Sequence, residues 1–236
     1  MSVRTAFWGI VFLIVITSAI QAQTKRKTSV TGRRAIVVDE RLSVLRTQPD
    51  VKAQLKQRLR RGRVIGILAI RKAKDGGQFL QVSVTRNTRG WILAEAVVKS
   101  GDSADAARLL KLIEESEDDF IKARLAKLCA EEFRLTAPAP SCLLKLGEAA
   151  ERAADRLTRD AKRRVGNQEP STGLSKRDYF LNFTGLDRYN RIGVMFDYDQ
   201  SADRIVYDGV AYRELLRRYP NSAEAEIAKG KFAKRQ

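Results

Sequence analysis

Residues 87–98 read Asn-Thr-Arg-Gly-Trp-Ile-Leu-Ala-Glu-Ala-Val-Val, and the character of the chain changes at this stretch. Upstream lie short runs of β-branched residues separated by turn residues, a pattern that predicts strands. Downstream the apolar residues recur at helical spacing. We therefore expect a multidomain protein with α and β parts: residues 34–99 form a small β-barrel that this stretch completes, and residues 103–236 form an all-α domain.

The barrel is predicted from several short strands at regular spacing, which is typical of small closed or nearly closed sheets. The runs are Ala35–Val38, Leu42–Leu45, Val64–Ile70, Phe79–Val84 and Gly90–Leu93. Val51–Leu59 is polar, with apolar residues at Val51, Leu55 and Leu59. Between two of the runs, Lys74-Asp75-Gly76-Gly77 is a strong hairpin signal. Gly66 lies inside a strand run and suggests a bulge or a close approach of another backbone.

The order of these motifs resembles the bacterial Src-homology-3-like domains of exported proteins. The matching segments are Leu42–Pro49, Leu55–Ile70, Phe79–Val84 and Gly90–Val98. Two positions depart from the family pattern, because Gln48 replaces the glycine usual before the proline and Phe79 stands where a tryptophan is common. The resemblance implies a module that binds a cell-wall peptide or a protein partner, in a groove that often uses these aromatic positions.

Four residues are candidates for the ligand site: Trp91, Phe79, Arg46 and Arg89. The Trp91 ring could stack on a ligand, although a large aromatic side chain more often fills a core. Arg46 and Arg89 could hold a carboxylate through paired hydrogen bonds. The alternative is that they are solvated surface charges of small energetic worth.

The charge of the chain is concentrated in one region. The net charge is +17, and residues 23–100 carry 19 Lys and Arg against 5 Asp and Glu. Such a region attracts anionic partners. The chain has no histidine, which excludes Ser–His–Asp and Cys–His sites and imidazole metal sites. With no phosphate-binding loop or zinc spacing either, we expect a protein that is not an enzyme and that has no cofactor and no metal.

The N-terminal segment has the features of a targeting signal. Residues 1–22 have the basic start, the apolar core and the small-residue end of a signal peptide, so we expect export to the periplasm or cell envelope. An uncleaved anchor is the alternative, because Lys25-Arg26-Lys27 follows the cleavage site. Residues 23–33 form a predicted basic arm. We expect no membrane span after cleavage, and no nucleic-acid partner.

The helical region is predicted to contain seven helices. They are Ala104–Glu115, Asp119–Phe133, Ser141–Val165, Lys176–Phe183, Leu186–Phe196, Asp208–Tyr219 and Ser222–Phe232. The segment Ala211–Ala225 resembles a repeat junction of exported tetratricopeptide proteins, and Phe133–Leu146 echoes it weakly. The two junctions are not separated by a multiple of about 34 residues. An irregular helical bundle is therefore the alternative to a tetratricopeptide-like stack.

Two further features of this region leave alternatives open. Cys129 and Cys142 are the two cysteines of the chain, and export would allow them to form a disulfide. A stagger of about 7 Å between the two helices favours two buried thiols instead. The segment Asp197–Asp208 has the alternating oxygens of a calcium loop. It lacks the required glycine and glutamate, so we expect an acidic turn.

The sequence thus favours a non-catalytic exported adaptor, with a binding barrel and a helical domain for protein interaction. The alternatives are a cell-wall hydrolase subunit with a carboxylate site and a basic protein attached to anionic envelope lipid.

Overall fold

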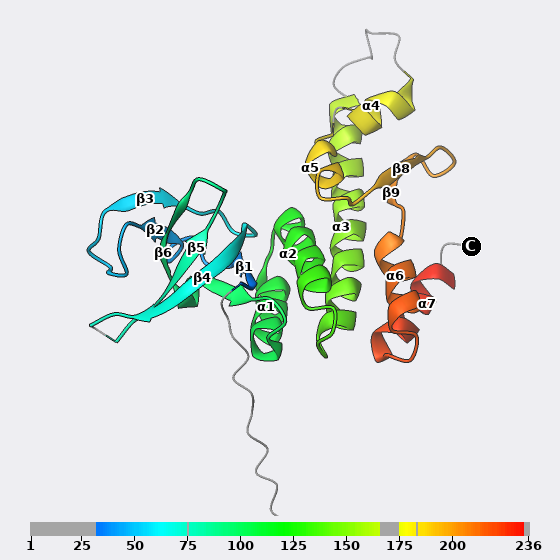
Figure 1. The fold of residues 1–236 in the computed structure, drawn as a ribbon. Coiled ribbons are helices and arrows are strands. Elements are labelled where there is room, and N and C mark those ends of the chain that lie inside the picture. Colours follow the sequence, from blue (N-terminus) through cyan, green and yellow to red (C-terminus); the bar gives the residue numbers. More distant parts are fainter. Residues whose placement is uncertain (1–31, 75, 166–174, 183, 234–236) are drawn as a thin grey trace, which may run out of the picture.

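The computed structural model describes residues 32–74, 76–165, 175–182 and 184–233 (Figure 1). The predicted signal peptide and the predicted arm up to residue 31 lie outside the described residues. The protein is a mixed α and β structure with an antiparallel sheet at one end and helices over the rest. Within the described part, none of the helices has both the length and the apolar run needed to cross a membrane.

Seven antiparallel strands form the main sheet, in the order β3-β2-β6-β5-β4-β1-β7. Their bounds are β1 Arg34–Val37, β2 Val44–Arg46, β3 Leu55–Arg58, β4 Val64–Lys72, β5 Gln78–Ser83, β6 Arg89–Leu93 and β7 Val97–Lys99. Among the described residues no ladder joins the outer strands β3 and β7. The sheet is therefore not closed by backbone pairing, so of the predicted closed or nearly closed sheets the closed form is not what this structure has.

Each outer strand has a physical means of staying unpaired. Strand β3 carries the charges Lys56 and Arg58, and charged side chains protect exposed edges. Strand β7 is covered by helix α1 (Ser103–Glu115). Arg108 Nη1 donates to the Val97 carbonyl at 3.2 Å, and the Asp105 carboxylate accepts from the Lys99 backbone N–H at 2.9 Å. The backbone groups at this edge therefore bond to a helix rather than to β3.

The inner face of the sheet holds one apolar cluster. It consists of Ala35, Val37, Leu45, Leu59, Ile65, Ile67, Leu80, Val82, Ile92, Ala96 and Val97. Gly90 is buried beside this cluster, and a Cβ at that position would lie 2.6 Å from the Arg46 carbonyl oxygen. Strand β4 has its register shift between Ile67 and Ala69. Gly66 is thus not at the register shift, and a Cβ at that position would meet nothing within 4 Å.

The helical half is arranged around one long helix, α3 (Ala139–Val165), against which α1, α2 (Asp119–Glu132) and α6 (Val210–Arg218) pack (Figure 1). The remaining helices are α4 Lys176–Asn182, α5 Asp187–Asn190 and α7 Ala223–Ala233. Asp102 caps α1 and Asp118 caps α2 through their carboxylates, as the sequence indicates. At 27 residues, α3 is about 40 Å long.

The predicted all-α region also contains a hairpin, which corrects that prediction. Strands β8 (Phe196–Asp199) and β9 (Arg204–Tyr207) pair antiparallel beside α3. The predicted helix over Leu186–Phe196 is only α5, since the chain turns at Gly193 with φ of 69°. Aromatic residues on both strands, with Ile205 and Val206 on β9, favour extended backbone. The structure therefore has two strands where helical spacing alone predicts none.

The two cysteines are joined. Cys129 in the last turn of α2 and Cys142 in the first turn of α3 form a disulfide, with their Cα atoms 5.8 Å apart. This separation lies within the range that a bridge allows. Helix α3 begins at Ala139, two residues earlier than predicted. The stagger of about 7 Å that was expected to keep the cysteines apart is therefore wrong. Of the two alternatives, the structure has the bridge.

The sheet and the helices share a second apolar cluster. Ile36, Val38 and Val98 of the sheet region belong to the same buried cluster as α1, α2 and α3. Polar contacts cross the same boundary, because Arg34 forms an ion pair with Glu132 at 2.8 Å. Ser100 Oγ also donates to the Glu132 carboxylate at 2.8 Å. The sheet therefore packs directly on the helical half.

Candidate functional site: a basic groove on the sheet

Trp91 lies on the outer side of the sheet rather than in its core. Its side chain is half-buried, and it is absent from both apolar clusters. The Arg71 guanidinium lies over its ring, 5.6 Å from the ring centroid. Such a cation on an aromatic face contributes about 0.5–1 kcal/mol at an exposed site. Trp91 thus supports a cation that the sequence did not single out.

Arg46 is the cross-strand partner of Trp91, so their side chains share the outer face. Its Nη1 donates to the Ala53 carbonyl oxygen at 2.7 Å. Ala53 belongs to the connection between β2 and β3, and a second bond from Thr47 N–H to the Gln54 carbonyl closes that connection at 3.1 Å. Arg46 therefore positions a loop of the site instead of facing a ligand with a free guanidinium.

The other two predicted residues do not join this arrangement. Phe79 is 0% exposed between its ladder partners Arg71 and Leu93, so it cannot contact a ligand in this structure. Arg89 is exposed, but it pairs with Ser83 at the opposite end of β6 from Leu93. The predicted set of four is thus reduced to Trp91 and Arg46.

A groove of about 590 Å³ lies next to Arg71. Its walls are the β2–β3 connection and the end of β4 with the turn that follows. The lining residues are Gln48, Pro49, Asp50, Val51, Lys52, Arg71, Lys72, Ala73 and Lys74. Val51 is 44% exposed, which gives the groove an apolar surface beside its charges. Pockets of this size take small ligands or short peptide segments.

Four of the lining side chains are cations and one is an anion: Lys52, Arg71, Lys72 and Lys74 against Asp50. The Asp50 carboxylate accepts from the Lys52 backbone N–H at 2.7 Å, so it serves the local turn. The sequence signal for this set was the basic run Arg71–Lys74 directly after a β-branched strand. That run leads into the predicted hairpin turn Lys74–Gly77, but it does not indicate a shared surface with Lys52.

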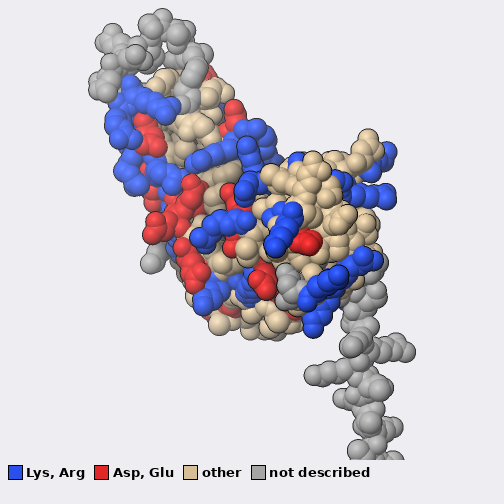
Figure 2. Space-filling view, turned by 90° about the vertical axis from the view of Figure 1, so that its left-hand side faces the viewer, with Lys and Arg blue, Asp and Glu red and all other residues tan. Residues whose placement is uncertain are grey.

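The positive charge of the sheet is largely unneutralised by the protein itself. Within the described residues, two cations of the sheet form ion pairs, Arg34 with Glu132 and Lys99 with Asp105. The other ion pairs join residues of the helical half to one another. Figure 2 views the molecule from the sheet side and shows red and blue intermingled over the helices, whereas blue predominates over the sheet.

The described residues contain no group of three or more Asp, Glu or Cys side chains placed to hold a metal ion. Comparison of the chain with protein-family models, with curated proteins and with solved structures found no match. The basic groove and the residues that position it, Arg46 and Trp91, are therefore the features of the molecule that indicate a function.

Proposed function

We propose that this chain is an exported, non-catalytic binding protein whose sheet takes an acidic peptide-like ligand, from the cell wall or from a protein, in the basic groove. The observation that carries the proposal is the clustering of Lys52, Arg71, Lys72 and Lys74 around exposed apolar surface, with one carboxylate among them. Charge of one sign in a concave site attracts the opposite charge and speeds encounter.

The supports of the groove favour a pre-formed site. Arg46 fixes the β2–β3 connection through Ala53, and the Trp91 ring lies beneath Arg71. A planar guanidinium held in this way suits a carboxylate, which it can bind through two parallel hydrogen bonds. A site fixed before the ligand arrives loses less conformational entropy on binding.

The resemblance to Src-homology-3-like domains of exported proteins agrees with this proposal, and the predicted signal peptide supplies the route to the envelope. The tetratricopeptide-like resemblance of the helical half extends the proposal to a second, protein partner. The mechanism needs no bond-making chemistry. The groove binds, and the rest of the chain carries the bound partner.

The proposal is tested by co-sedimentation with purified peptidoglycan at low and moderate salt. We expect R71Q/K74Q to weaken the affinity at both salts by about a hundredfold, since two charge-assisted hydrogen bonds of about 1.5 kcal/mol each are lost. The matched control R58Q/R86Q also removes two charges, from residues that do not line the groove. W91L should weaken binding less than R71Q/K74Q, because it removes only the support of Arg71.

The outcomes separate the alternatives. Equal loss in R71Q/K74Q and R58Q/R86Q, with binding abolished by moderate salt, would indicate general charge attraction. Sedimentation with anionic vesicles in preference to peptidoglycan would favour the envelope-lipid alternative. Failure to sediment with peptidoglycan at either salt would remove the wall ligand and leave a protein partner for the groove.

A further inference from the structure

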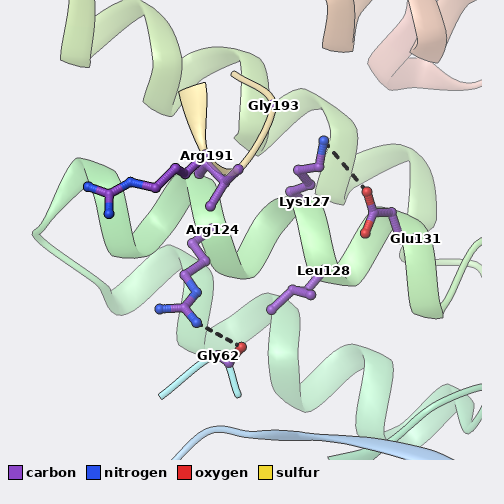
Figure 3. Close-up of a pocket in the computed structure, with 8 residues that line it drawn as sticks. Gly62, Arg124, Lys127, Leu128, Glu131, Arg191 and Gly193 are labelled. Atoms are coloured by element: carbon purple, nitrogen blue, oxygen red, sulfur yellow. Dashed lines mark hydrogen bonds and ion pairs between the residues drawn. The ribbon is translucent and has the colours of Figure 1, made fainter. Parts of the chain in front are cut away.

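A second basic pocket, of about 400 Å³, lies where the sheet meets the helical half. It is separate from the groove and independent of the function proposed for it. Figure 3 shows its three walls: Gly62 from the β3–β4 turn, one face of α2, and the segment that follows α5. Its lining residues are Gly62, Arg124, Lys127, Leu128, Glu131, Arg191, Ile192 and Gly193.

Two glycines allow the backbone to approach the cations of this pocket. Gly62 has φ of 75° and Gly193 has φ of 69°, a conformation that side chains disfavour. A Cβ at Gly62 would lie 2.8 Å from Arg124 Nε, and a Cβ at Gly193 would lie 2.9 Å from Lys127 Nζ. At these two glycines the wall opposite α2 has no side chain, so Arg124 and Lys127 lie directly against backbone there.

The pocket holds three cations and one carboxylate. Lys127 pairs with Glu131 at 3.6 Å. Arg124 Nη2 donates to the Gly62 carbonyl oxygen at 3.2 Å, and Arg191 Nε donates to the Asp187 carbonyl oxygen at 3.2 Å. Neither guanidinium has a carboxylate partner among the described residues. Each guanidinium has five N–H donors, so both can donate further bonds to a ligand.

The remaining charge indicates the ligand class. The two arginines leave an excess of two positive charges once Lys127 and Glu131 are paired, and guanidinium groups match phosphate and carboxylate oxygens. We propose that this pocket binds a small dianion, an organic phosphate or a dicarboxylate, between Arg124 and Arg191. In Figure 3 these two side chains extend to the same side of the pocket, away from the Lys127–Glu131 pair.

The test is calorimetric titration of the full chain with inorganic phosphate, succinate and, as a monovalent comparison, acetate, at low ionic strength. We expect at least one dianion to bind more tightly than acetate. R191Q should weaken that binding about tenfold, because one charge-assisted contact is lost. Arg191 is exposed and its described hydrogen bond is within its own turn, so this change should not disturb the fold.

Two further variants keep the result interpretable. E131Q removes the carboxylate of the pocket and should tighten dianion binding several-fold, an effect that damage to the fold would not produce. R217Q removes an exposed charge on α6 that pairs with Glu214, and it should leave the affinity unchanged. Binding of phosphate alone or of succinate alone supports the proposal and identifies the source. Binding of neither, or equal loss in R191Q and R217Q, would overturn it.

Discussion

The Asp203 carboxylate connects the β8–β9 turn to two other elements. It accepts from Lys176 Nζ of α4 at 2.7 Å and from the Tyr198 hydroxyl at 2.5 Å. The hydrogen bonds from Lys176 and from Tyr198 hold the pKa of Asp203 below its ordinary value of 3.8. Burial and the hydrogen bond to Asp203 raise the pKa of Tyr198 to about 12. The Asp199 carboxylate also has hydrogen-bond partners within the turn, since it accepts from the backbone N–H groups of Ser201 and Ala202.

These shifts predict a pH dependence with a definite sign. Because the pKa of Asp203 is lower in the folded protein than in the unfolded chain, its ionised form stabilises the fold above pH 3.8. That contribution is lost as the pH falls through the folded-state pKa. The difference in thermal midpoint between the wild type and D203N should therefore shrink as the pH is lowered from 5 to 2, about the range over which such carboxylates protonate.

An optical titration checks the same contact from the other side. In D203N the pKa of Tyr198 should fall from about 12 toward the ordinary value of 10.0, as followed by phenolate absorbance. Asparagine keeps the volume of the side chain but removes its charge. An unchanged Tyr198 titration in D203N would show that the carboxylate does not hold the phenol.

The disulfide between Cys129 and Cys142 should stabilise the folded protein. Cys129 and Cys142 are 13 residues apart, and closing a loop of this length stabilises a fold by about 3 kcal/mol through the unfolded state. Denaturant unfolding with and without a reductant should differ by about this amount. The variant C129A/C142A should lose a similar amount and be insensitive to the reductant. Identical unfolding curves with and without the reductant would mean that the cysteines are free thiols.

At the scale of the elements, α3 and α6 meet through a glycine. A Cβ at Gly147 of α3 would overlap the ring of Tyr212 on α6. Tyr212 is fully buried and its ring belongs to a continuous series of aromatic contacts along the helical half. The series runs Phe120, Tyr189, Phe196, Tyr207, Tyr212 and Phe232, with neighbouring ring centroids 5.3 to 6.3 Å apart. The ring therefore has little freedom to move aside.

Replacing this glycine separates packing from helix propensity. An alanine raises intrinsic helix propensity by about 1 kcal/mol, but overpacking a fixed core costs about 1–3 kcal/mol. We expect G147A to lower the free energy of unfolding by up to about 2 kcal/mol, the difference between these two effects, measured by chemical denaturation. The control is G230A on α7, where a Cβ meets nothing within 4 Å. It should raise stability by about 0.5–1 kcal/mol. Equal effects in the two variants would contradict the packing argument.

The elements also show which parts of the fold were predictable. The sequence predicts the main strands and the starts of α1 and α2, because β-branched runs, Gly-rich turns and Asp caps are local signals. The β8–β9 hairpin was missed. Its strands are four residues each, and in the first of them aspartates alternate with Phe196 and Tyr198. The tertiary contact that selects it, Thr158 Oγ1 accepting from Ile205 N–H at 2.9 Å, lies 47 residues away in the chain.

The candidate site was predictable only in part, for a similar reason. Gly90-Trp91 marked the right strand, and the structure explains the pair: Gly90 faces inward against Arg46 while Trp91 faces outward. Period-two alternation shows which side chains share a face of the strand, but it does not show whether other parts of the protein bury that face. Phe79 shares the outer face with Trp91 and is nevertheless buried. Lys52 and Arg71 line the same groove because of the order of the strands in the sheet, and no local sequence motif predicts that order.

At the scale of the whole molecule, charge and packing divide the chain differently. The excess positive charge lies in the sheet region. Most described ion pairs of the helical half are internal to it, although two carboxylates on its helices pair with Arg34 and Lys99 of the sheet. The apolar cores do not follow this division, because Ile36, Val38 and Val98 of the sheet region are buried with the helices. The two regions can thus differ in electrostatic role and still depend on one another for stability.

This packing predicts that the sheet and the helices unfold together. Trp91 reports on the sheet once Trp8 is replaced by phenylalanine, and ellipticity at the helical band reports on the helices. We expect denaturation curves from the two signals to coincide, the accepted sign of a cooperative transition. I36A, which removes a buried side chain from the shared cluster, should lower both midpoints together, by about 2–5 kcal/mol in unfolding free energy. I67A is the matched control, because it creates a cavity of the same kind in the cluster that belongs to the sheet alone. If I36A or I67A separates the two curves, the sheet and the helices are independent folding units, and the contacts between them contribute little to stability.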